Sequence, residues 1–178
     1  MSGSNFGQGV DADASYFFSR YSLIWGWATW ARAWRHYSPD LAEWPELRGR
    51  GWLEELFDGD LQAVQYWTYI FDQRRTLGDT WDAGWLFGSW LAGGLAAVPC
   101  RNLVTNVGFG EQATNTRTDY VGVFAGVPAL AADSPLRHPL RLERDVDADA
   151  FLEDVMFSGN LNRLFQRIRS FRRETAAR

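Results

Sequence analysis

The segment that decides the fold is residues 16–34, with the sequence YFFSRYSLIWGWATWARAW. Its first ten residues are aromatic and extended in character, which predicts a strand. From there Trp27, Trp30 and Trp34 recur with the period of one helical face, so a helix of about ten residues is predicted to follow. Gly26 permits close backbone approach, and flat rings beside a glycine suit the apolar faces of a sugar or a nucleobase. The alternative interpretation is a core strand and helix that are simply aromatic.

Composition sets the broad class of the protein. The chain has 178 residues, of which 46% are hydrophobic, enough for one domain with a sizeable core. Its ten Trp residues exceed what such a core needs. Because an indole N–H requires a hydrogen-bond partner, some of these rings are expected to line a groove.

Charge and cysteine usage exclude several function classes. All 18 basic residues are Arg, so mechanisms that need an amine nucleophile or a Schiff base are excluded. The net charge of −4 argues against nucleic acid as the main partner. Cys100 is the single cysteine and has no nearby partner for a disulfide or a zinc site, so a cytoplasmic location is expected. His36 and His138 are interpreted as surface or turn residues.

Hydrophobic spacing predicts the remaining elements. Helices are expected over residues 52–57, 61–77, 81–91, 147–157 and 160–174, and strands over residues 95–98, 103–107 and 139–145. Asp60 is the expected N-cap of the second of these helices, with Val64, Trp67 and Phe71 on one face.

The helix over residues 81–91 is apolar nearly all round and is predicted to be buried. Thr80 is its expected N-cap, and Gly93-Gly94 should end it. In contrast, residues 1–15 combine Gly, Ser, Asn and Asp without a hydrophobic period and are predicted to form a loop.

Two acidic residues stand at the start of this buried helix, in the segment GDTWDAGW at residues 78–85. Asp79 and Asp82 are three residues apart, and carboxylates at this position complement the helix dipole, which is the structural interpretation. The functional interpretation is a general base that projects from the helix end into an aromatic cleft. Farther along, NLVTNVGFGEQATNTR at residues 102–117 is a Gly-rich loop that suits either phosphate binding or an ordinary surface loop.

The order and spacing of these segments resemble a bacterial family of glycosyltransferases with the GT-A fold, similar to family 2 and often labelled hemolytic protein. In that family a segment similar to SGSNF, residues 2–6, precedes the aromatic segment, and GDTWD and NLVTNVGFG follow in the same order. A more distant similarity is to the N-acetylglucosaminyltransferase I family, in which a Gly-Trp segment precedes the segment with the catalytic base. The resemblance covers residues 1–117, about two thirds of the chain.

This resemblance implies an α/β fold of which the chain is the C-terminal, acceptor-side portion. Residues 1–145 would form the acceptor-side part of the catalytic domain, and residues 146–178 a C-terminal amphipathic helical segment. The N-terminal donor-binding half, with its Asp-x-Asp metal motif, would precede Ser2 and is expected to be absent. Mg²⁺ or Mn²⁺ would therefore serve the complete enzyme and would not be bound by this portion.

The resemblance also implies a set of site residues. Asp82 takes the place of the base, with Asp79 as the alternative. The implied substrate-binding residues are Trp25, Gly26, Trp27, Trp30, Trp81, Gly108, Gly110 and Arg117. Those at 25–27 would wall the acceptor site, and the loop from 108 to 117 would close over the donor. Gln112 and Asn115 replace an Asp and a His that the family usually carries.

The expected function is transfer of a sugar from a nucleotide-diphosphate sugar to a hydroxyl acceptor in surface glycan or polysaccharide synthesis. The partners would be the nucleotide sugar and a glycan acceptor. A non-catalytic carbohydrate-binding module and an inactive fragment are the alternatives, the latter prone to self-association. The Arg-rich helix at 160–174 is expected to dock with a solvated basic face, and contact with the inner face of the membrane is the alternative.

Overall fold

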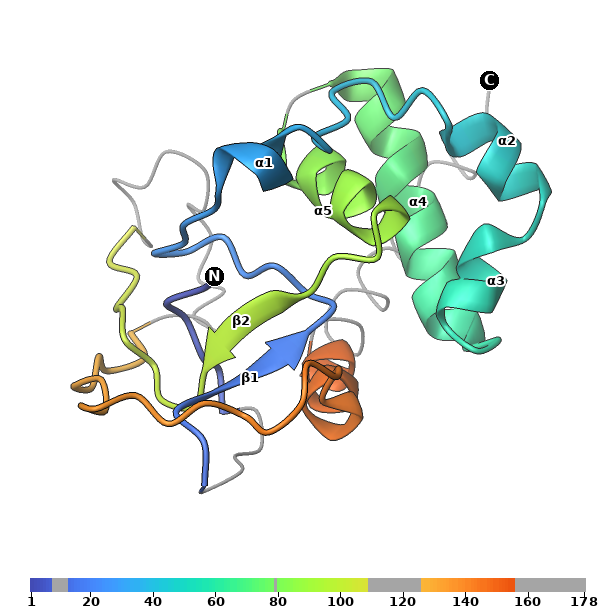
Figure 1. The fold of residues 1–178 in the computed structure, drawn as a ribbon. Coiled ribbons are helices and arrows are strands. Elements are labelled where there is room, and N and C mark those ends of the chain that lie inside the picture. The colour runs from blue at the N-terminus through green and yellow to red at the C-terminus, as the bar shows by residue number, and fades with distance from the viewer. Residues whose placement is uncertain (8–12, 79, 109–125, 156–178) are drawn as a thin grey trace, which may run out of the picture.

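The structure is a computed structural model that describes residues 1–7, 13–78, 80–108 and 126–155 (Figure 1). Its elements are β1 (Tyr16–Ser19), α1 (Ala31–Trp34), α2 (Trp44–Gly49), α3 (Trp52–Leu56), α4 (Leu61–Leu77), α5 (Asp82–Leu91) and β2 (Ala96–Pro99), followed by a helix over 146–155. Figure 1 shows α2 to α5 gathered on one side of the molecule and the strands on the other. This mixture agrees with an α/β class at the coarse level. The sheet of a GT-A fold is not identifiable among the described residues.

The sheet is small, and irregular chain extends both of its edges. β1 pairs with β2 in antiparallel register, with Tyr16 opposite Pro99. On the outer edge of β2, the Ser2 N–H donates to the Ala97 carbonyl at 2.8 Å. On the outer edge of β1, the Asp145 N–H donates to the Phe18 carbonyl at 2.8 Å. The N-terminal residues are thus a loop in conformation, as predicted, but residues 2–5 are buried.

The strands predicted over 103–107 and 139–145 are wrong, apart from a single bridge between Phe18 and Arg144. Over 103–107, the Leu103 N–H donates to the Gly3 carbonyl at 2.8 Å, and the Val104 carbonyl accepts from the Asn102 side-chain amide at 2.6 Å. Backbone groups satisfied in this way need no neighbouring strand.

α4 forms as its sequence predicts. The Asp60 carboxylate accepts from the N–H groups of Gln62 and Ala63, at 2.8 and 3.2 Å. Gly78 ends the helix in the left-handed conformation, at a φ of 66°. The predicted apolar face of the helix is buried, and it contains Val64, Trp67 and Phe71.

α5 is buried almost all round, as predicted, with Ala83 to Gly88 and Trp90 shielded from solvent. Gly93 and Gly94 end it as expected, because their N–H groups donate to the carbonyls of Trp90 and Ser89. The predicted cap at Thr80 is wrong. The helix begins one residue later than expected, so Trp81 occupies the N-cap position and supplies no side-chain hydrogen bond.

The ten-residue helix predicted after Trp27 is also wrong, since α1 spans four residues only. Ala28 explains the difference: its N–H donates to the Met1 carbonyl at 3.0 Å, and its carbonyl accepts from the Met1 amino group at 2.9 Å. The Ala28 carbonyl is therefore not free to accept from a helical N–H four residues later. Trp30, the N-cap residue, is extended, with φ −98° and ψ 148°.

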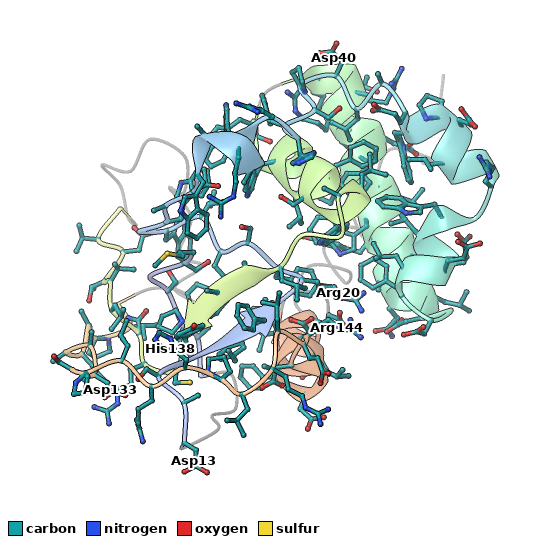
Figure 2. The ribbon with its side chains drawn as sticks, in the orientation of Figure 1. Asp13, Arg20, Asp40, Asp133, His138 and Arg144 are labelled. Carbon is teal, nitrogen blue, oxygen red and sulfur yellow. The ribbon has the colours of Figure 1, made fainter. Side chains whose placement is uncertain are left out.

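The helix over 146–155 is attached to β1 through Asp149, which is 2% exposed. Its carboxylate accepts from the Ser19 hydroxyl at 2.5 Å and lies 3.6 Å from Arg20 Nε and 3.7 Å from Arg144 Nε. Figure 2 shows the two arginines beside this helix. Burial raises the pKa of Asp149 to about 6, against the hydrogen bonds from Ser19 and Arg20.

None of the helices within the described ranges combines the length and apolar character needed to cross a bilayer. The helix predicted over 160–174 lies outside those ranges.

Candidate functional site

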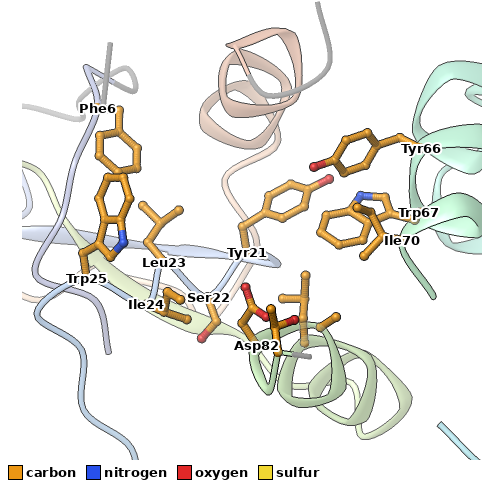
Figure 3. A pocket seen from close by; sticks show the side chains of 13 residues that line it. Phe6, Tyr21, Ser22, Leu23, Ile24, Trp25, Tyr66, Trp67, Ile70 and Asp82 are labelled. Carbon is orange, nitrogen blue, oxygen red and sulfur yellow. The ribbon is translucent and has the colours of Figure 1, made fainter. Parts of the chain in front are cut away.

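A cavity of about 420 Å³ lies between the chain segment after β1, α4 and the beginning of α5 (Figure 3). Its lining residues are Phe6, Tyr21, Ser22, Leu23, Ile24, Trp25, Tyr66, Trp67, Ile70, Thr80, Asp82, Ala83 and Leu86. Five of these are aromatic, and none carries a positive charge. Apolar walls with few polar groups are typical of a small-molecule site.

Two groups of rings form opposite walls of the cavity. Phe6 meets Trp25 edge to face, with centroids 5.5 Å apart, and Figure 3 places this pair on one side. Tyr66 and Trp67 of α4 lie on the other side, perpendicular to each other at 5.1 Å. Tyr21 lies between the walls and stacks on Trp67 with a centroid distance of 6.1 Å.

Asp82 places a carboxylate at this cavity from the first turn of α5. Figure 3 shows it directed toward Tyr21. Its Oδ1 atom is shielded from solvent and has no hydrogen-bond partner among the described residues. The helix dipole favours a negative charge at this position, but it does not replace a hydrogen bond. A buried acceptor of this kind is available to a ligand that brings its own donor.

Trp67, which also lines the cavity, carries a buried donor without a hydrogen-bond partner among the described residues, and Figure 3 shows its indole nitrogen on the side of Tyr66. Three other buried indoles donate within the protein: Trp44 to Asp72 at 2.9 Å, Trp85 to Ser22 at 3.1 Å and Trp90 to the Arg20 carbonyl at 2.8 Å. The Nε1 of Trp67 has no acceptor among the described residues, although the side chain is only 5% exposed. Buried indole N–H groups usually find one.

The Tyr21 hydroxyl is already engaged. It donates to Glu153 Oε1 at 2.7 Å, so the ring of Tyr21 remains as the part that lines the cavity. Burial, followed by the nearby Glu153 carboxylate, raises the pKa of Tyr21 far above its usual value. Burial also raises the pKa of Glu153. Tyr21 therefore stays neutral at physiological pH and presents an uncharged wall.

The structure brings together two of the site residues inferred from sequence, Asp82 and Trp25. Trp27 and Trp81 do not line this cavity; their rings stack on each other at 5.0 Å in a separate cluster. Trp30 is 49% exposed, with the Arg32 guanidinium 4.9 Å above its ring.

The inferred glycines that the structure describes, Gly26 and Gly108, do not line the cavity. Gly26 adopts a φ of 59° and packs against Val104, where an added Cβ would collide with the valine side chain. Gly108 is exposed, and its N–H donates to Asn106 Oδ1 at 2.8 Å. The remaining inferred residues, Asp79, Gly110 and Arg117, lie outside the described residues.

Several lining residues were not inferred from the sequence, above all Phe6, Tyr66 and Trp67. Trp67 was assigned to the core by its helical period, and nothing in its neighbourhood indicates that its indole lacks an acceptor. Phe6 belongs to a segment whose composition indicates a loop. The only usable signal was the excess of Trp, which predicts that some rings line a groove without saying which.

The cavity offers few ligands for a divalent cation. Among the described residues, no group of three or more His, Cys, Asp and Glu side chains is placed to hold a metal ion. The cavity offers one carboxylate, from Asp82, whereas Mg²⁺ requires a near-octahedral set of oxygen ligands.

Comparisons with protein-family models, with curated proteins and with solved structures found no significant match.

Proposed function

We propose that this chain is the acceptor-binding part of a nucleotide-sugar-dependent glycosyltransferase of GT-A type, with Asp82 as the general base. One observation carries the proposal: the Oδ1 atom of Asp82 is buried, lacks a hydrogen-bond partner among the described residues, and belongs to a side chain that lines an aromatic cavity. The expected reaction is cytoplasmic, and its product would enter surface glycan or polysaccharide synthesis.

In this reaction Asp82 accepts the proton of an acceptor hydroxyl. The acceptor oxygen forms a bond to the anomeric carbon of the donor sugar while the bond from that carbon to the diphosphate breaks. The nucleotide diphosphate leaves with the bonding electrons. A positioned base typically contributes about 10²- to 10⁴-fold to such a step. The rings of Phe6, Trp25 and Tyr66 exclude water and offer flat apolar surfaces to the acceptor.

The Asp82→Asn substitution tests the assignment of the base. Transfer from a panel of nucleotide-diphosphate sugars, with Mn²⁺ and a glycoside acceptor, is measured by mass spectrometry. We expect the variant to lose at least about 100-fold in kcat while its donor affinity is retained. The reason is that Asn preserves the shape of the side chain but cannot take up the proton.

Asp58→Asn is the matched control. Asp58 is exposed and lies outside the cavity, and its φ of 51° is a conformation that Asn adopts readily. This variant should transfer sugar at the wild-type rate. Undiminished transfer by Asp82→Asn would refute the assignment of the base.

A carbohydrate-binding module is a second candidate, because part of the tryptophan cluster reaches the surface. Trp34 and Trp81 are 39% and 38% exposed, and both rings contact Trp27. Glycan binding that needs no nucleotide, survives Asp82→Asn and is lost on Trp81→Ala would favour this function. Sugar transfer abolished by Asp82→Asn would favour the enzyme.

A further inference from the structure

We propose that the cavity selects an uncharged acceptor and that Trp67 determines how this acceptor is oriented. In this arrangement the indole Nε1–H of Trp67 donates to one oxygen of the acceptor, while Asp82 accepts from a hydroxyl. The inference rests on the proposed function, since it specifies the acceptor of the same site. The inference makes two claims. The cavity prefers an uncharged acceptor, and Trp67, which the sequence assigns to the core, binds that acceptor.

The first argument is the distribution of unpaired polar atoms. Four buried side-chain nitrogen or oxygen atoms in the described residues have no hydrogen-bond partner, and they belong to Ser2, Trp67, Arg74 and Asp82. Two of the four, Trp67 Nε1 and Asp82 Oδ1, come from side chains that line this one cavity. Unpaired buried polar groups are rare and costly, so two at one cavity indicate a ligand that pairs with both.

The second argument is that these two atoms are complementary in kind. Trp67 can only donate, and an ionised Asp82 can only accept. A ligand that satisfies both must offer an accepting oxygen and a donating group. Alcohols offer both through hydroxyls, whereas an ammonium group only donates and a carboxylate only accepts. The pair of atoms therefore favours a neutral ligand with hydroxyl groups.

The third argument is the charge of the surroundings. Asp82 carries the only formal charge among the described lining residues, and no Arg or His accompanies it there. Outside the lining, the Tyr21 hydroxyl donates to the Glu153 carboxylate, and the positive charge of Arg20 acts on both groups. An anionic ligand would therefore meet the Asp82 carboxylate with no cation among the described lining residues to offset it, which opposes binding.

The size of the cavity also limits the ligand. A volume of about 420 Å³ lies at the lower end of small-molecule sites. One sugar ring with a small apolar substituent suits this space better than an oligosaccharide. The substituent would lie against aromatic and aliphatic walls, such as Trp25, Leu23 and Ile70.

The test compares two probes that differ in charge at one position, phenyl β-D-glucoside and phenyl β-D-glucuronide. Their affinities for the full chain are measured at pH 7 without nucleotide, by saturation-transfer NMR and calorimetry. We expect the glucoside to bind and the glucuronide to bind at least about tenfold more weakly. In Asp82→Asn this difference should shrink to about twofold or less, whereas Asp58→Asn should keep it.

Trp67→Phe tests the indole donor, because Phe keeps an aromatic ring but has no N–H. The glucoside affinity should fall about three- to tenfold, the loss of one hydrogen bond. Trp52→Phe is the matched control, since Trp52 packs on Phe87 at 5.5 Å outside the cavity. It should leave the affinity unchanged. Circular dichroism checks that each variant is folded. If Trp67→Phe does not fold, the inference is judged by the relative affinities of the glucoside and the glucuronide.

Three results would overturn the inference: equal affinity for both probes, no binding of either to the folded chain, or an unchanged affinity in a folded Trp67→Phe variant. The last would mean that the indole N–H is directed at the ring of Tyr66, 5.1 Å away. These results are separable from the proposed function. Efficient transfer to an anionic acceptor would refute only the charge selection, and probe selectivity without any transfer would refute only the enzymatic proposal.

Discussion

At the scale of single residues, two glycines of α5 determine how closely a neighbouring segment can approach the helix. Gly84 and Gly88 are one helical turn apart and share a face. A Cβ added at Gly84 would collide with the Ser38 carbonyl, and one added at Gly88 with the His36 carbonyl. The backbone at 36–38 therefore lies directly on the helix. The apolar pattern predicts burial of α5, but it does not predict this partner.

Gly88→Ala should destabilise the protein, because its methyl group would need space occupied by backbone. We expect the free energy of unfolding to fall by about 3 kcal/mol, at the upper end of overpacking effects. Gly49→Ala is the control, since no atom lies within 4 Å of a Cβ at that position in α2. That variant should be neutral or stabilised by up to about 1 kcal/mol. Urea denaturation measures both, and equal stability of the two variants would contradict the close approach.

At the scale of elements, α4 and α1 show when a local pattern is sufficient. For α4 all the signals are local: Asp60 is the N-cap, the apolar residues recur with the helical period, and Gly78 ends the helix. For α1 the Trp period is present, yet Ala28 forms hydrogen bonds with Met1 instead of entering a helix. A contact across 27 residues thus outweighs a local preference.

Asp60→Ala should remove the N-cap of α4. Two backbone N–H groups would lose their acceptor, at a cost of about 1 kcal/mol in the free energy of unfolding. Asp60→Asn keeps an accepting oxygen and should lose less than half as much. Thermal and urea denaturation of the three proteins provide the measurement. Equal losses for Ala and Asn would show that charge, and not the cap, stabilises this end of the helix.

At the scale of the whole molecule, buried polar groups connect segments that are far apart in the chain. Asp149 joins the helix over 146–155 to Ser19 and Arg20, about 130 residues earlier. Asn5 likewise contacts β2 and the chain after it: its side-chain amide donates to the Pro99 carbonyl at 2.7 Å, and its N–H donates to the Asn102 side-chain oxygen at 3.0 Å. Such contacts hold irregular chain in place where regular ladders are absent.

The raised pKa of Asp149 predicts a pH dependence of stability. Because burial raises this pKa from 3.8 to about 6, the folded state binds the proton more tightly than the unfolded state. The contribution of Asp149 to the free energy of unfolding is therefore fully present below about pH 4 and is lost as pH rises through 6. Relative to Asp149→Asn, the wild-type free energy of unfolding should fall by about 1–3 kcal/mol between pH 4 and pH 7.

Asp133 provides a control of opposite sign. A hydrogen bond from Arg137 lowers its pKa, so its contribution should be present at neutral pH and lost as pH falls. Melting curves of the wild type, Asp149→Asn and Asp133→Asn from pH 3 to pH 7 would measure both slopes, that of Asp133 at the acid end, below about pH 4. A slope of the same sign in the two comparisons would contradict the assignment to burial at Asp149.

The sequence by itself determined the elements whose signals lie within a few residues of each other. The helices at 52–56, 61–77 and 82–91 were predicted closely, as were β1 and β2 in part. The segment with Asp79 and Asp82 was also interpreted as a candidate site for a general base, and the family resemblance placed the base at Asp82. Caps, stops and hydrophobic period act locally, so a single sequence is enough to predict them.

Only the tertiary structure decided where the cavity lies and which atoms in it remain unpaired. Its lining comes from Phe6, the segment after β1, α4 and α5, which no local pattern connects. Trp67 and Trp90 have the same side chain and nearly equal burial, yet only Trp90 finds an acceptor. The reason is physical: whether a buried donor is paired depends on the neighbours that packing brings within about 3 Å, and those neighbours are distant in sequence.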